Sequence, residues 1–130
     1  MLKVTKIVLA LLATVFILIA MRWLVTPAGV ATEFGFELAH GLGRSSQIGD
    51  MFGYFLTTGV CVLVGVVSGQ RVWFYPPMLL LFLTSIGRLV AWLVHDAAFA
   101  TGPLMIEVVS ISVLLIASRL FARAETAPNQ

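Results

Sequence analysis

Cysteine is almost absent from this chain, because Cys61 is the single one among 130 residues. One cysteine cannot form an internal disulfide, a CxxC redox pair or a cysteine-rich metal site. Cys61 lies inside an apolar run, so we expect it to be a small core residue. The sequence also lacks a nucleophile elbow, a phosphate-binding loop and an HExxH motif. It therefore identifies no catalytic residue and predicts no cofactor, which favours a role other than that of an enzyme.

Charged residues are scarce as well. Only 11% of the residues are Asp, Glu, Lys or Arg, whereas 60% are hydrophobic and the mean hydropathy is +1.04. In a soluble domain about a quarter of the residues are charged, so water cannot be the main solvent of this chain. The eight basic residues mostly flank apolar runs, which is typical of membrane anchoring and gives no support to nucleic-acid binding.

The rest of the sequence consists mainly of apolar runs. These runs are long enough to cross a bilayer as helices. About 20 residues match the hydrocarbon thickness at 1.5 Å per residue, and suitable runs cover residues 4–25, 51–69, 76–95 and 103–121. The first resembles a secretion signal, but Ala20, Met21 and Arg22 make a poor cleavage site, so we expect it to be retained. The sequence predicts an all-α integral membrane protein, a four-transmembrane-helix bundle forming a single domain over residues 1–130.

The segments between these runs are more polar. Residues 27–43 follow Thr26 and begin with Pro27, a pattern that favours a helix start. We expect a short surface helix in this first outer loop, with a re-entrant segment as the alternative. Residues 44–50 are interpreted as a loop before the second span, and residues 122–130 as a flexible tail.

Basic residues predict the orientation of the chain. With four spans, one side of the membrane receives five of them and the other side two, the larger set being Lys3, Lys6, Arg71, Arg119 and Arg123 and the smaller set Arg22 and Arg44. Cytoplasmic loops carry the excess of Lys and Arg. We therefore expect both termini to be cytoplasmic and the protein to be a multi-pass protein of a bacterial inner (cytoplasmic) membrane.

Arg88 and Glu107 are the charged residues that lie farther inside predicted spans, whereas Lys6, Arg22 and Arg119 lie close to span ends. Placing such a charge in hydrocarbon costs about 3 kcal/mol on insertion scales, so we expect the Arg88 and Glu107 side chains to face the bundle interior and to form an intramembrane ion pair. Other polar residues recur at helical spacing along the second, third and fourth spans, which predicts inward polar faces that include Asp50, Tyr54, Thr57, Cys61, Ser68, Thr84, His95, Ser110 and Ser118.

Two interpretations of this polar cluster stay open. In the first, the polar groups only hold the helices together by hydrogen bonds and ion pairing. In the second, they line a ligand pocket open to the outer face, where Arg88 or Arg44 would hold an anionic headgroup or a carboxylate. The residues assigned to this cluster are Arg44, Asp50, Arg88, His95, Asp96 and Glu107.

Glu33, Glu37 and His40 form a weaker candidate site. On a helix they would share one face and contain the Glu-x-x-His spacing of di-iron bundles. Those sites require a second such helix, and this chain adds only His95 and Asp96 elsewhere. The sequence therefore favours no metal, and a solvated face of the surface helix is the preferred explanation.

Arg44 ahead of a glycine-rich second span, Gly87-Arg88-Leu89 in the third, Asp96 after it and Glu107 in the fourth together resemble a bacterial family. It is an uncharacterised family of small four-span membrane proteins, domain-of-unknown-function family 4345, with a layout similar to that of DoxX-like proteins. The resemblance spans about residues 40–120 and implies a four-helix membrane bundle in which Arg44, Arg88, Asp96 and Glu107 match recurring polar positions. It implies no reaction.

The function predicted first is that of an accessory or structural subunit of a larger membrane complex. Its partners would be membrane lipids and either other membrane subunits or a second copy, met through the glycine faces of Gly49-x3-Gly53 and Gly65-x3-Gly69. The alternatives are a lipid- or small-molecule-binding protein, with enzyme activity left open, that uses the outer-half pocket, and an oligomeric transporter or channel.

Overall fold

The computed structural model describes residues 1–126, and within them the chain is all-α. Its elements are α1 (Leu2–Val25), α2 (Pro27–Glu33), α3 (Gly41–Ser68), the 3-10 helix η1 (Arg71–Phe74), α4 (Tyr75–Val94) and α5 (Thr101–Glu125). Four helical segments in this part of the chain are long and apolar enough to cross a membrane, and they comprise α1, α3, η1 with α4, and α5. The chain is thus a small multi-pass membrane protein, as the apolar runs predict.

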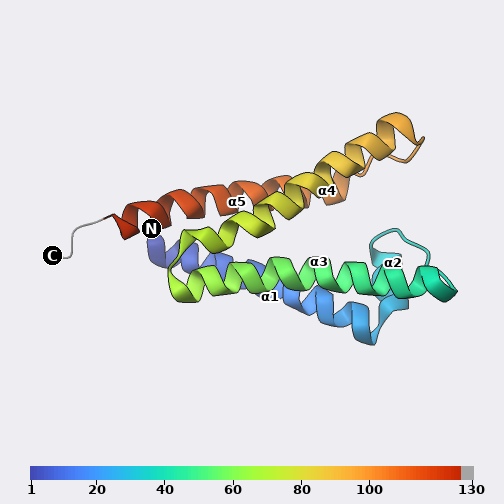
Figure 1. Ribbon diagram of the computed structural model, residues 1–130, viewed down its shortest axis with the longest axis horizontal. Coiled ribbons are helices and arrows are strands. Elements are labelled where there is room, and N and C mark those ends of the chain that lie inside the picture. Colours follow the sequence, from blue (N-terminus) through green and yellow to red (C-terminus); the bar gives the residue numbers. More distant parts are fainter. Residues whose placement is uncertain (127–130) are drawn as a thin grey trace.

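The long helices associate as two pairs. α1 packs along α3, and α4 packs on α5, as Figure 1 shows. The pairs are joined where η1 contacts α3 and α5, and they diverge toward α2. Met1 and the described end of α5 lie at the joined end, called here the terminal end, and the opposite end is called the α2 end.

Glycine allows the close contact between α1 and α3. A Cβ atom at Gly59 would lie 2.7 Å from Ile17 Cγ1 and 2.9 Å from the Ala13 carbonyl oxygen, so no larger residue fits there without a shift. Gly65 is covered by the Phe74 ring in the same way. By contrast, a Cβ atom at Gly49 or Gly53 would meet nothing within 4 Å. The expectation that Gly49 and Gly53 pack closely on a neighbour is therefore not met within residues 1–126.

The helix α3 begins at Gly41, ten residues before the predicted span, and residues 44–50 are helical where a loop was expected. Side chains explain this early start. Arg44 Nε donates to the Ala39 carbonyl at 2.9 Å, and Gln47 accepts from the Ala39 amide at 2.9 Å and donates to the Glu37 carbonyl at 3.3 Å. These bonds hold segment 34–40 against the first turns of α3. At 1.5 Å per residue the 28-residue helix is about 42 Å long, more than a hydrocarbon core needs.

The inward face of α3 also differs from the prediction. Its buried residues are Phe55, Thr58, Gly59, Val62 and Gly65, whereas Asp50, Thr57 and Ser68 are exposed. The polar stripe was placed about one residue away from the true face, because glycine and valine rather than the polar side chains set the contact with α1. Thr58 satisfies its hydroxyl within the helix, on the Tyr54 carbonyl at 2.8 Å.

The helix α5 continues to Glu125, into the segment interpreted as a flexible tail, and residues 127–130 of that tail lie outside the described residues. Glu125 contacts η1 from there, since its carboxylate lies 3.4 Å from Arg71 Nε and accepts from the Arg71 amide at 3.1 Å. This contact ties the last turn of α5 to the connection between the helix pairs.

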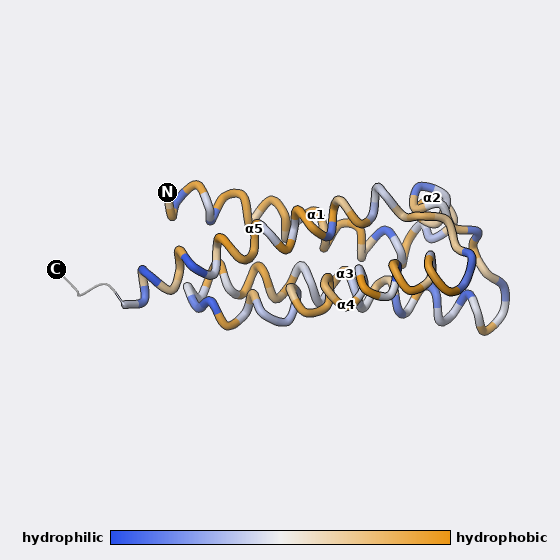
Figure 2. The backbone as a smooth tube through the Cα atoms, turned by 90° about the horizontal axis from the view of Figure 1, so that it is seen from above, coloured by the Kyte–Doolittle hydropathy of each residue, from blue (hydrophilic) through white to orange (hydrophobic). Residues whose placement is uncertain are grey.

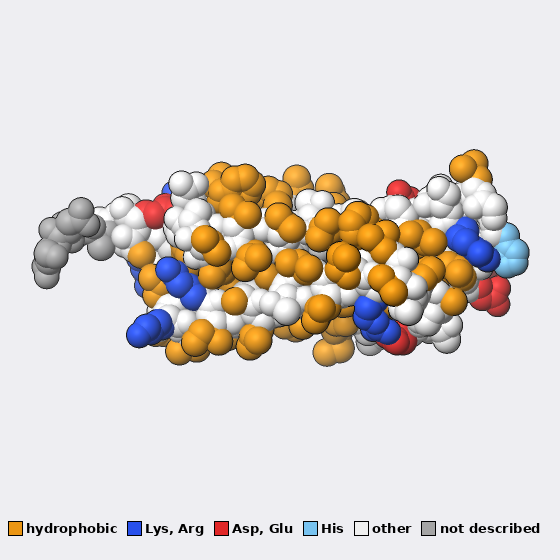
Figure 3. Space-filling model, turned by 90° about the horizontal axis from the view of Figure 1, so that it is seen from below, with side chains coloured by type: hydrophobic (Ala, Val, Ile, Leu, Met, Phe, Trp, Pro, Cys, Tyr) orange, Lys and Arg blue, Asp and Glu red, His pale blue; other side chains and the backbone are white. Residues whose placement is uncertain are grey.

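Hydrophobic residues occupy the middle of the molecule in Figure 2, and on the face seen in Figure 3 hydrophobic side chains cover the middle while charged ones gather toward the two ends. Many large hydrophobic residues on α1, α4 and α5 are exposed, among them Leu11, Leu18, Phe82, Leu93 and Ile116. In water such a surface would drive aggregation, whereas acyl chains solvate it. The exposed apolar belt therefore fits a chain that lies in a bilayer.

Candidate functional site

Arg88 on α4 and Glu107 on α5 form the predicted ion pair. Arg88 Nε donates to Glu107 Oε1 at 2.8 Å, and the Ser85 hydroxyl donates to Glu107 Oε2 at 2.7 Å. Only 5% of the Glu107 side chain is exposed. Both oxygens of the buried carboxylate are thus satisfied by groups on α4, so the prediction of an intramembrane ion pair is confirmed.

The Arg88 guanidinium has hydrogen-bond donors that Glu107 does not use. Within residues 1–126 its guanidinium makes one hydrogen bond, from Nε, and its two terminal nitrogens make none. The side chain is 26% exposed. Glu107 fixes the orientation of the group while the terminal nitrogens remain free to meet another oxygen.

Arg88 and Glu107 line a cavity of about 360 Å³ between the two helix pairs, in the half of the bundle that includes the α2 end. This volume is in the usual range for a small-molecule site, roughly 300–1,000 Å³. Helices α1 to α5 all contribute to the walls, which are formed by Phe16, Glu33, Phe34, Tyr54, Phe55, Leu81, Arg88, Gly102, Pro103, Ile106 and Glu107.

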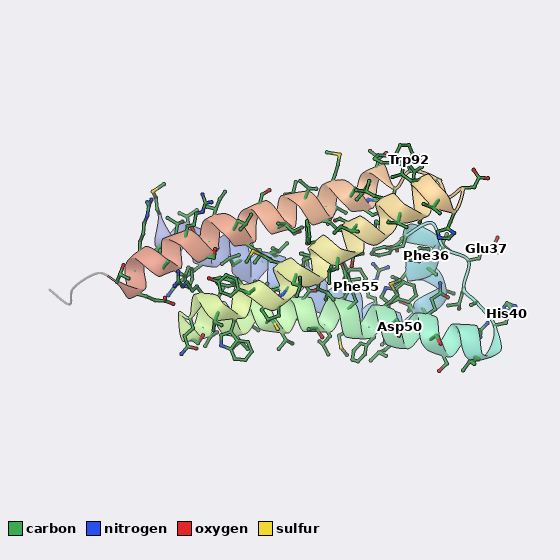
Figure 4. The ribbon with its side chains drawn as sticks, turned by 45° about the horizontal axis from the view of Figure 1, so that its top comes forward. Phe36, Glu37, His40, Asp50, Phe55 and Trp92 are labelled. Atoms are coloured by element: carbon green, nitrogen blue, oxygen red, sulfur yellow. The ribbon has the colours of Figure 1, made fainter. Side chains whose placement is uncertain are left out.

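Aromatic rings form one side of the cavity. The Phe55 ring centroid lies 5.4 Å from that of Phe34 and 5.9 Å from that of Phe16, and Figure 4 shows Phe55 in the space between the helix pairs. Behind Phe34 lies the fully buried Trp23, with 6.3 Å between the ring centroids. The Trp23 indole N–H has no hydrogen-bond partner among the described residues. This side of the cavity is aromatic and closely packed.

From the lining residues that are exposed, we infer that the cavity opens between α2 and the first turns of α5. The lining residues that are exposed there are Glu33, Gly102 and Ile106, and the Ile106 side chain is more than half exposed at the flank of the bundle. Glu33 is held at this opening by Arg22, whose terminal nitrogens donate to its two oxygens at 2.5 Å and 2.9 Å. The hydrogen bond from Arg22 lowers the pKa of Glu33, so the carboxylate stays charged at neutral pH.

The other residues of the predicted cluster do not line this cavity. Arg44, Asp50, His95 and Asp96 are all exposed at the α2 end. His95 and Asp96 end α4, and Asp96 has a φ of 53°, the left-handed conformation that follows many helices and that aspartate tolerates better than most residues. Arg44 is engaged with the Ala39 carbonyl. Of the six residues in the predicted polar cluster, the structure thus brings two together at the cavity, Arg88 and Glu107.

The predicted metal candidates do not share a helical face. α2 ends at Glu33, and Glu37 and His40 follow in a segment without helix, at the α2 end in Figure 4. Glu33 is already paired with Arg22. Within residues 1–126 no group of three His, Cys, Asp or Glu side chains is placed to hold a metal ion.

Sequence reasoning missed the apolar part of the site. Phe16, Phe34 and Phe55 are three of nine phenylalanines, and nothing in their spacing separates them from those that face outward. Glu33 was considered only as a metal ligand. The charge of opposite sign eleven residues earlier, Arg22, is the signal that would have suggested its pairing.

No known protein family, curated protein or solved structure matches the chain. The resemblance to the small four-span family with a DoxX-like layout therefore has no support from these comparisons.

Proposed function

We propose that this protein binds a small amphiphilic molecule of the membrane in the cavity between its helix pairs. The observation that carries the proposal is Arg88, which lines the cavity with its terminal nitrogens unpaired within residues 1–126 while Glu107 anchors its Nε. The apolar walls would take the hydrocarbon part of the ligand, and Arg88 would hold its polar part.

A purely structural ion pair explains less of this arrangement. In an apolar interior, each unsatisfied polar group costs about 1–3 kcal/mol, more for charged groups. In this pair the buried Glu107 carboxylate is fully satisfied, whereas the terminal nitrogens of Arg88 are not buried and have no partner within residues 1–126. Here the described part of the chain leaves donors beside an apolar cavity of ligand size. A bound oxygen acceptor would complete the hydrogen bonding of Arg88.

The sequence supports the subunit hypothesis through its glycine motifs. The contacts that these glycines make in the structure weaken that support. Gly59 and Gly65 make their close contacts inside the chain, with α1 and with Phe74. Gly49 and Gly53 remain open, so a partner helix or a second copy at that face stays a prediction. A transporter role also stays a prediction.

The proposed orientation places the α2 end, and with it the cavity, in the outer half of the membrane. Lys3, Lys6, Arg119 and Arg123 belong to the segments at the terminal end, where Lys6 Nζ lies 5.7 Å from the Phe121 ring centroid. The positive-inside rule puts this basic end in the cytoplasm. The ligand would then come from the outer leaflet.

Protein purified in mild detergent together with its native lipids tests the proposal. Native mass spectrometry should find a small molecule bound to the wild-type chain, because the cavity shields it from detergent exchange. Arg88→Met should reduce the bound fraction at least tenfold, since a charge-assisted hydrogen bond contributes about 1.5–3 kcal/mol.

Arg119→Met is the matched control, because Arg119 is an exposed arginine on α5 that does not line the cavity. It should leave the bound fraction unchanged. Arg88→Lys keeps the charge next to Glu107 and guards against a folding defect, yet loses the planar set of donors. A bound molecule retained by both Arg88 variants, or a wild-type chain with none, would contradict the proposal.

A further inference from the structure

The charges around the cavity are already balanced. The charged residues that line it within residues 1–126 are Glu33, Arg88 and Glu107. Glu107 is paired with Arg88, and Glu33 is paired with Arg22 just outside the cavity. Two cations thus face two anions, and the site has a formal charge of zero before any ligand arrives.

A charged ligand would disturb this balance. A carboxylate or phosphate on Arg88 would place that guanidinium between two anions, one of them the buried Glu107, in surroundings where an unbalanced charge is costly. An ammonium group would find no unpaired carboxylate on the cavity wall and no acceptor on Arg88. An uncharged carbonyl or hydroxyl oxygen accepts from the terminal nitrogens of Arg88 and adds no charge.

The size of the cavity limits the rest of the ligand. About 360 Å³ corresponds to roughly a dozen water-sized groups at about 30 Å³ each. This volume encloses a head and part of one chain, not both chains of a phospholipid. Phe16, Phe55 and Leu81 offer the chain an apolar wall, and the opening beside Ile106 faces the flank of the bundle, where acyl chains lie.

Building on the proposed function, we propose that the ligand is an uncharged, single-chain amphiphile with an ester, ketone or alcohol oxygen that accepts from Arg88. Its chain enters from the lipid between α2 and α5. The proposal differs from the anionic headgroup expected from the sequence, because the expectation counted Arg88 without the Glu107 carboxylate that neutralises it.

Quenching of Trp23 fluorescence by brominated probes tests this ligand class. Trp73→Phe with Trp92→Phe leaves Trp23 as the single tryptophan of the chain. Trp23 is fully buried behind the cavity wall residue Phe34, so bromine in the bulk detergent stays away from it while bromine inside the cavity lies near. The probes are a bromine-tipped dodecanoic acid, its methyl ester and the corresponding amine, used where acid and amine are charged.

The methyl ester should quench Trp23 saturably, at a concentration at least tenfold lower than either charged probe, and Arg88→Met in the same background should remove this preference. A variant with Trp92 alone is the control, because that side chain is 45% exposed and reports only the bulk concentration of each probe. It should respond equally to ester, acid and amine at equal partitioning.

Equal or stronger quenching by the ionised acid would overturn the proposal in favour of an anionic ligand. Equal saturable quenching by a brominated two-chain phospholipid would overturn the single-chain assignment. If the ester fails to quench while the wild-type protein still carries a molecule that Arg88→Met loses, this inference fails and the proposed function stands. If the purified protein carries no such molecule, the proposed function fails first.

Discussion

Glu107 is the residue on which the site is organised. It is almost fully buried, yet Arg88 and Ser85 satisfy both of its oxygens from the neighbouring helix. A carboxylate held in this way binds α4 to α5 and fixes the direction of the guanidinium. The same contact therefore serves packing and, in our proposal, ligand binding.

Replacing one residue of the Arg88–Glu107 pair should lower the free energy of unfolding by more than replacing both. Arg88→Met leaves the Glu107 carboxylate buried and unpaired, and we expect the free energy of unfolding to fall by about 2 kcal/mol. Arg88→Met combined with Glu107→Met should recover at least half of that loss, because no charge is left in the apolar interior. Circular dichroism during unfolding in a denaturing detergent measures both values.

Arg119→Met is the control for this comparison, since Arg119 is exposed near the terminal end of α5. It should change the free energy of unfolding by less than about 0.5 kcal/mol. A double variant as unstable as Arg88→Met alone would show that the pair does not balance charge in the way described.

The ion pair was predictable because a charge in an apolar run has few acceptable places, and two such charges on neighbouring spans have fewer still. The exposed positions of the remaining candidates could not be predicted in the same way. His95 and Asp96 stand at the end of α4, and Arg44 bonds a loop carbonyl, positions that depend on where each helix ends. The Phe16, Phe34 and Phe55 rings gave no signal, because apolar side chains in a membrane protein face either lipid or the core.

Among the elements, α1 and α3 form the most closely packed pair. Their backbones approach at Gly59, where the Ala13 carbonyl and Ile17 leave no space for a methyl group. This pair forms one side of the bundle, on which α2 and segment 34–40 rest through the contacts of Trp23 with Phe34 and Phe36. The aromatic wall of the cavity therefore depends on the register of α1 against α3.

Gly59→Ala tests this dependence. The added methyl group should force the helices apart and lower the free energy of unfolding by about 1–3 kcal/mol, as overpacking does in well-packed cores. Gly53→Ala is the matched control on the same helix, since a Cβ there meets nothing within 4 Å. It should be neutral or stabilising by up to about 1 kcal/mol, because alanine favours helix. Equal effects of the two changes in the same unfolding assay would contradict the assigned register.

Helix positions followed from hydropathy better than helix ends did. The apolar runs predicted α1, α3, α4 and α5, because about 20 apolar residues have no other stable form in lipid. The early start of α3 escaped prediction, since glycine and serine before residue 50 resemble a loop, and the Gln47 bonds that hold it connect residues eight to ten positions apart.

The whole molecule is a bundle that is closed at one end and open at the other. Where the pairs meet, Phe74 of η1 packs on Phe121 of α5, with 5.1 Å between the centroids of these two rings. Toward the α2 end the pairs diverge, as Figure 1 shows. The residues that line the cavity come from both pairs. Composition and span count do not determine this divergence, because the angle between two helix pairs depends on side-chain packing along their whole length.

An experimental density map at side-chain resolution, from protein purified without removal of its lipids, tests the account most directly. We predict a continuous elongated feature between Phe16 and Phe55 that ends within hydrogen-bonding distance of the terminal nitrogens of Arg88, with Glu107 still paired to Arg88 Nε. A map in which the helix pairs have closed over an empty cavity, or in which Arg88 points outward into lipid, would contradict it.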